Sequence, residues 1–284
     1  MGNSENTFKN YDSTWEDEDY EDTTESFMLW GEDSRDTHAA EDMHKYRCTY
    51  RLIHSSDMRE HTDSPQDENS PNLWFYQNKI PMNFDGMSIE EFHMYWFGDY
   101  DKLEHVHSYI QWLFPLDETG MNSPYKLSTR AIRMFRRDEA AKKRLLTSYR
   151  LMLDFYGTQL VDEKTGEVQR AVNWEERFAN LNRNAHNNLR ITRILKCLGL
   201  LGFRHYQAPL VHFFLVETLV KGTLPQIKQS VLDYFMFAVV DRLERKQLIK
   251  FALCYFEPKE KFVWCPSGVR IKFLKELKRA QTDQ

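Results

Sequence analysis

Apolar residues recur at helical spacing through most of the chain after residue 70. The clearest early stripe, with steps of three and four residues, consists of Leu103, Val106, Ile110 and Leu113. Such spacing places apolar side chains on one face of an amphipathic helix. We expect that helix to begin near Asp99 and to end at Pro115, because the residue before a proline is biased out of the α region.

The same periodicity predicts further helices over residues 88–96, 128–156, 173–180, 189–198, 209–220, 223–238 and 243–256. Two of them begin with capping-box patterns, Ser88 with Glu91 and Thr223 with Gln226. Thr165-Gly166 lies between two short alternating runs, which predicts a surface β-hairpin. The predicted fold class is therefore all-α: a single multi-helix globular domain with one small β-hairpin and a disordered acidic N-terminus.

The negative charge of the chain is concentrated at its N-terminus. Residues 1–44 hold 14 Asp and Glu against Lys9 and Arg35, a net charge of −12, so the formal charge of −5 leaves +7 for the rest. This composition predicts a disordered acidic tail over residues 1–44. We expect a linker or docking segment over 45–70, the helical domain over 71–265 and a charged C-terminal tail over 266–284.

Several classes of function lack their sequence signatures. The chain has no nucleophile elbow, phosphate-binding loop or zinc-protease motif, and no His or Cys pair has zinc-finger spacing. We therefore predict no enzyme activity, no cofactor and no metal. The body carries only mild positive charge and no basic-aromatic motif, so no nucleic-acid partner is expected. No apolar run approaches the length of a transmembrane span.

Two polar stretches suggest a binding site. In NAHNNLR over 184–190, either Asn184 or Asn187 can cap the following helix. The remaining polar groups are candidate ligand contacts or bind loop backbone: His186, Asn188 and Arg190. Gln111, within the apolar stretch HSYIQWLFP over 107–115, has the same two interpretations.

Six segments, in order along the chain, resemble the opioid growth factor receptor family. They are NLWFYQNKI over 72–80, HSYIQWLFPL over 107–116, HNNLRITRILK over 186–196, QAPLV over 207–211, DYFMFAV over 233–239 and KFVW over 261–264. Together they cover roughly residues 70–265. The acidic run DSTWED over 12–17 is similar to the start of the vertebrate receptor, which favours the receptor over its receptor-like paralogue.

This resemblance implies a non-enzymatic receptor for the opioid growth factor, the pentapeptide Tyr-Gly-Gly-Phe-Met, that restrains cell growth. Members of the family are associated with the nucleus and the nuclear envelope, so we expect the nucleus and perinuclear cytoplasm as the location. The implied partners are the opioid pentapeptide and proteins of nuclear import or growth control.

Such a peptide presents aromatic groups, an ammonium and a carboxylate, so its site should combine an apolar wall with charged rims. The expected wall consists of Trp96, Tyr109 and Trp112, although core packing explains the same aromatics more readily. The expected charged contacts are Asp99 or Asp101 for the ammonium and Arg190 or Arg193 for the carboxylate. The polar contacts that complete the site are Gln111, His186 and Asn188.

A second interpretation needs no pentapeptide site. A helical protein-interaction scaffold, with an acidic tail and a basic helix over 133–144 that recruit partners, accounts for the same composition. The presence or absence of a ligand-sized cleft separates the two interpretations.

Overall fold

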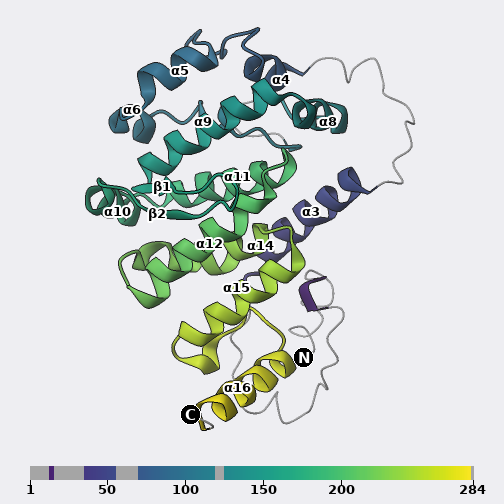
Figure 1. Cartoon of the computed structure of the whole chain (residues 1–284), viewed down its shortest axis with the longest axis vertical. Coiled ribbons are helices and arrows are strands. Elements are labelled where there is room, and N and C mark those ends of the chain that lie inside the picture. The colour runs from purple at the N-terminus through teal and green to yellow at the C-terminus, as the bar shows by residue number, and fades with distance from the viewer. Residues whose placement is uncertain (1–12, 16–34, 56–69, 119–124, 283–284) are drawn as a thin grey trace.

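The computed structural model describes residues 13–15, 35–55, 70–118 and 125–282. Figure 1 shows the helices of this part stacked along the long axis of the molecule, from α4 and α5 at one end to α16 at the other. In these ranges the only strands form one two-stranded hairpin, so the predicted all-α fold with a small β-hairpin is confirmed. None of the helices in these ranges has the length and apolar character needed to cross a bilayer.

The first half of the stack contains helices α4 to α9 and the hairpin. Their bounds are α4 Pro71–Tyr76, α5 Ile89–Trp96, α6 Tyr100–His105, α7 Ile110–Leu113, α8 Thr129–Arg137, α9 Glu139–Phe155, β1 Thr158–Leu160 and β2 Val168–Arg170. The strands are antiparallel, with Gln159 opposite Gln169.

The second half is built around α11, which is buried along most of its length. Its helices are α10 Trp174–Arg183, α11 His186–Leu200, α12 Gln207–Leu215, α13 Lys228–Ser230, α14 Met236–Ala238, α15 Arg242–Tyr255 and α16 Ser267–Thr282. Two π-helices continue α12 and α13, over Val216–Val220 and Val231–Phe235. Short 3₁₀ turns lie at Ser13–Trp15, Arg204–Tyr206, Pro225–Ile227 and Lys259–Lys261.

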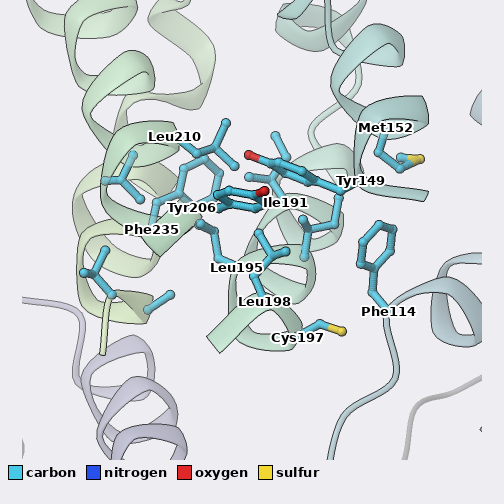
Figure 2. Packing of buried hydrophobic residues seen from close by; sticks show 14 of the residues in the cluster. Phe114, Tyr149, Met152, Ile191, Leu195, Cys197, Leu198, Tyr206, Leu210 and Phe235 are labelled. Atoms are coloured by element: carbon cyan, nitrogen blue, oxygen red, sulfur yellow. The ribbon is translucent and has the colours of Figure 1, made fainter. Parts of the chain in front are cut away.

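The core lies between α9, α11 and the segments that follow α11. Figure 2 shows Ile191, Leu195 and Leu198 of α11 at its centre. Tyr149 of α9 stacks on Tyr206 with ring centroids 5.4 Å apart. This packing fixes α11 as the axis against which the other helices are placed.

Two expected helices are divided by capping or loop residues. The range 128–156 is two helices, because the Asp138 backbone is extended and its carboxylate accepts from the Ala141 amide at 3.0 Å, which starts α9. The helix expected from Asp99 to Pro115 is α6 and α7, broken at Val106, whose φ of −86° and ψ of 133° are extended.

One of the two predicted capping boxes is confirmed. The Ser88 hydroxyl accepts from the Glu91 amide, and the Glu91 carboxylate accepts from the Ser88 amide. The second prediction is wrong, because the Thr223 hydroxyl donates to the Glu217 carboxylate at 2.6 Å instead of capping a helix.

The expected acidic tail and linker do not have a boundary at residue 44, because helix α3, Thr37–His54, runs through it. Asp36 caps α3 by accepting from the Ala39 amide, and Ala39, Ala40 and Met43 are buried. Helix α3 packs against α14 near the middle of the stack (Figure 1). The short apolar stripe of α3 lies within an acidic segment, so the charge of that segment predicted a tail instead of a helix. The rest of residues 1–34, apart from Ser13–Trp15, lies outside the described residues.

If α3 belongs to the folded core, Met43→Ala should lower the free energy of unfolding by about 2–5 kcal/mol, the range for a buried large-to-Ala change. Urea unfolding monitored by circular dichroism measures this loss. Leu52→Ala on the same helix is the matched control, because Leu52 is exposed and its loss should stay within about 0.5 kcal/mol. Equal free energies of unfolding for the Met43→Ala and wild-type chains would show that α3 is not part of the folded core.

Candidate functional site

The break between α6 and α7 is held by the guanidinium of Arg190 on α11. The main-chain carbonyls of Leu103, Glu104 and Val106 accept from Arg190 at 2.7, 3.2 and 3.0 Å. The Tyr109 hydroxyl donates to the Leu103 carbonyl at 2.8 Å and accepts from Arg190 Nη1 at 3.3 Å. Carbonyl groups at the end of a helix need a partner when they are buried. Arg190 supplies that partner from 84 to 87 residues away in the sequence.

The Glu104 carboxylate lies beside this break and gathers amide donors from α10 and α11. It accepts from the side-chain amide of Asn180 and from that of Asn187, at 3.2 Å for the closer oxygen of the latter contact. His186 Nε2 lies 2.6 Å from Glu104 Oε1, a contact distance for an ion pair, without the alignment of a hydrogen bond. We call Glu104, His107, Tyr109, His186, Asn187 and Arg190 the Arg190 junction.

His107 covers the junction on its outer side. Its Nδ1 accepts from Arg190 Nη2 at 2.7 Å, which places the imidazole proton on Nε2. Its ring meets that of His186 edge-on, with centroids 5.2 Å apart. Partial burial, the positive charge of Arg190 and the neighbouring His186 lower the pKa of His107, so this imidazole is neutral at pH 7.

The junction joins α6, α7, α10 and α11 through internal hydrogen bonds. Arg190 directs each of its terminal nitrogens to three acceptors within the protein. Within the described ranges, no group of three or more His, Cys, Asp or Glu could hold a metal ion. Positioning of chain segments is therefore the role that this geometry supports.

Three of the residues selected from the sequence meet here: Tyr109, His186 and Arg190. The neighbouring aromatics pack into the core rather than around a cavity. Trp96 stacks on Phe92 with centroids 4.6 Å apart, and Trp112 meets Phe75 edge-on at 5.4 Å.

The two selected aspartates serve the start of α6. Asp99 caps the helix through the Lys102 amide and pairs with the Lys102 ammonium at 2.8 Å, and these bonds lower its pKa. Asp101 is exposed, and its Oδ1 lies 3.3 Å from His105 Nδ1.

The other selected residues lie on α7 and α11. Arg193 donates to the Phe114 carbonyl at 2.7 Å, and burial lowers its pKa. Gln111 and Asn188 are buried, and the Asn188 carbonyl accepts from Thr192. The two helix caps considered for α11 are wrong, because its N-cap is Ala185, while Asn187 lies inside the helix. Their joint role as a peptide site stays a prediction.

A surface hollow of about 440 Å³ lies between the β-hairpin and the α12 segment, away from all ten selected residues. Its walls include Glu167 and Val168 of the hairpin and Pro209, His212, Phe213 and Lys221 of the α12 segment. We call it the hairpin hollow. It combines apolar surface with both signs of charge at its rim.

Buried Glu217 fixes the two walls of the hairpin hollow to each other. It accepts two bonds from Arg170 of β2, at 2.9 and 2.6 Å, and one from Lys221 at 2.9 Å. Burial raises the pKa of Glu217, but bonds from Arg170, Thr223 and Lys221 outweigh it and hold the pKa below its usual value. The π-helix over Val216–Val220 contains this carboxylate, and such helices are frequent at functional sites. A Glu within the apolar run FFLVETLV over 213–220 was the sequence signal for this site.

These features define an all-α domain with a hydrogen-bonded central junction and a surface hollow of about 440 Å³ beside its hairpin. The family model described as the opioid growth factor receptor conserved region matches residues 65–270. The chain belongs to the opioid growth factor receptor family. No solved structure matches it.

Two groups of curated relatives are similar to the chain. Opioid growth factor receptor-like protein 1 of Rattus norvegicus is 50% identical over 233 residues, which is 82% of this chain and 48% of the relative. The opioid growth factor receptor of Homo sapiens is 49% identical over 241 residues, 84% of this chain and 34% of the relative. The chain thus spans about half or less of these relatives. Their similar identities do not separate receptor from receptor-like protein, so the preference for the receptor stays a prediction.

If Arg190 holds the α6–α7 break, Arg190→Met should lower the free energy of unfolding by about 3 kcal/mol, because it leaves buried carbonyl groups unpaired. Denaturant unfolding measures the change. Arg183→Met is the control, because Arg183 is exposed at the end of α10 and its loss should cost less than about 0.5 kcal/mol. A stability within 1 kcal/mol of wild type in Arg190→Met would contradict the role of Arg190.

Proposed function

We propose that this chain is a non-enzymatic receptor for opioid growth factor, the pentapeptide Tyr-Gly-Gly-Phe-Met, and that it restrains growth in the nucleus and perinuclear cytoplasm. Its family membership is the observation that carries the proposal, because the match covers residues 65–270 and relatives near 50% identity are named as receptors of this factor. Partners from nuclear import or growth control belong to the same proposal.

The hairpin hollow is the place on this fold that suits such a ligand. Its volume of about 440 Å³ falls within the range of small-ligand pockets, roughly 300–1,000 Å³. Phe213, Pro209 and Val168 offer apolar surface to the aromatic groups of the peptide. The exposed Glu167 carboxylate suits its ammonium, and Lys221 suits its carboxylate.

The Arg190 junction is less suited to the same ligand. A peptide carboxylate at Arg190 would have to displace main-chain carbonyls that are already bound at 2.7–3.2 Å. That exchange leaves buried carbonyl groups without a partner, which costs more than a surface contact returns. We therefore assign the junction to architecture and the hollow to the ligand.

Calorimetric titration of the full chain with the pentapeptide tests the receptor proposal, with a scrambled pentapeptide as the control ligand. We expect saturable one-to-one binding of the correct sequence alone. Absence of heat from a chain shown to be folded by circular dichroism would contradict the receptor proposal.

Two charge deletions test the location. Glu167→Ala and Lys221→Ala should each weaken pentapeptide binding by about fivefold, the effect of losing one rim ion pair of about 1 kcal/mol. Matched controls are Glu175→Ala and Lys143→Ala, exposed charges outside the hollow, which should leave the affinity unchanged. Binding at wild-type affinity in both hollow variants would leave the receptor proposal intact and contradict the hairpin hollow as its site.

An interaction scaffold is the second candidate, and one observation favours it. Met94, Tyr95 and Phe97 at the end of α5 are 71%, 62% and 58% exposed, and adjacent exposed apolar groups are typical of protein-binding surfaces. A folded chain that binds no pentapeptide would make this surface the functional one.

A further inference from the structure

A three-residue segment from the N-terminus is docked on helix α15, far from it in sequence. Ser13–Trp15 forms a short 3₁₀ turn that contacts α15, as the turn beside α15 in Figure 1 shows. Thr14 is 0% and Trp15 3% exposed, burial comparable to that of core residues. We call this segment the plug and the surface of α15 that receives it the slot.

Specific contacts hold the plug in its slot. The Thr14 hydroxyl accepts from Arg245 Nε at 2.7 Å. Arg245 Nη1 donates to the Val239 carbonyl at 2.6 Å, so the main chain fixes the guanidinium in place. Lys246 Nζ lies 5.5 Å from the centroid of the Trp15 ring, within range of a cation–π contact.

The size of the plug makes its docking a reversible equilibrium. Burial of one Trp is the main favourable contribution, and the ordering of three residues opposes it with a comparable entropy cost. Short segments near a chain terminus open well below the free energy of global unfolding. The Thr14 hydroxyl is therefore enclosed when docked and accessible when released.

The sequence around the plug resembles a substrate for an acid-directed kinase. Thr14 is followed within five positions by Glu16, Asp17, Glu18 and Asp19. Protein kinases select substrates partly by such charge patterns.

We propose that Thr14 is a phosphorylation site and that its modification empties the slot on α15. A protein kinase transfers the γ-phosphoryl group of a nucleoside triphosphate to the released Thr14 hydroxyl. The new bond joins Thr14 Oγ1 to phosphorus, the β–γ anhydride bond breaks, the nucleoside diphosphate leaves and the hydroxyl proton passes to solvent.

The phosphorylated plug does not fit the slot from which it came. A phosphoryl group adds a charge of about −1.5 to −2 and three oxygens, whereas the docked Thr14 has no exposed surface to accommodate them. Arg245 faces Thr14 through Nε, but its Nη1 is committed to the Val239 and Val240 carbonyls, so the whole guanidinium is not available to pair a phosphate dianion. Burying that charge without full pairing is unfavourable, so the released state becomes the stable one.

Fluorescence anisotropy with a labelled synthetic peptide of residues 11–19 tests the slot directly. The full chain carrying Trp15→Ala should bind this peptide at least tenfold more tightly than the wild-type chain, whose own plug competes for the slot. Trp30→Ala, the same substitution elsewhere in the N-terminal segment, is the control and should behave as wild type. The same peptide phosphorylated at Thr14 should bind the Trp15→Ala chain at least tenfold more weakly.

A second measurement needs no change at Trp15. In hydrogen exchange of the full chain, Thr14→Glu should raise exchange in the first turns of α15, whereas Thr24→Glu should not. A phosphopeptide that binds as tightly as the unmodified peptide, or more tightly, would overturn the switch. Failure of a folded Trp15→Ala chain to bind the unmodified peptide, or unchanged exchange in Thr14→Glu, would overturn the slot.

Discussion

The guanidinium of Arg190 is the contact on which the arrangement of the first half of the stack depends. It accounts for three carbonyl groups left open where the chain breaks between α6 and α7, and it anchors them to the central helix α11. The Glu104 carboxylate, held by amide groups of Asn180 and Asn187, ties α10 to the same point. Because these groups satisfy one another, the most polar part of the interior serves architecture, and its charges are not offered to a ligand.

A ligand site is easier to build where a buried charge holds two chain segments together and leaves polar groups exposed beside them. Glu217 does this at the hairpin hollow, because its bonds from Arg170 join the hairpin to the π-helix, while Glu167 and Lys221 lie at the rim. Because the wall of this hollow is already formed, its own residues need little ordering when a short peptide binds. The family relationship and this geometry thus support the same function from independent directions.

Periodicity was sufficient to predict α10, α11, α12, α15 and the hairpin. It did not predict α16, Ser267–Thr282, because its many charged residues suggested a C-terminal tail over 266–284. Periodicity failed at Val106, where the helix is broken. Arg190, 84 residues later in the sequence, donates to the Val106 carbonyl at this break. Periodicity also failed at α3, where acidic composition concealed Ala39, Ala40 and Met43. For the site, the sequence placed Arg190, Tyr109 and His186 among ten candidates for one peptide site, but it could not show that Arg190 and Tyr109 make their hydrogen bonds within the protein. The hairpin hollow depends on contacts between residues 40 to 50 positions apart, which no local pattern encodes.

Photo-crosslinking tests most directly the claim that the hollow, and not the Arg190 junction, receives the peptide. The probe is the opioid pentapeptide with a benzophenone in place of the ring of its phenylalanine, and its sites of attachment are mapped by mass spectrometry. We predict attachment at Val168, Phe213 or Val216 that excess unlabelled pentapeptide abolishes. Attachment at Trp96, Tyr109 or Trp112, abolished in the same way, would contradict the account and return the site to the residues around the junction.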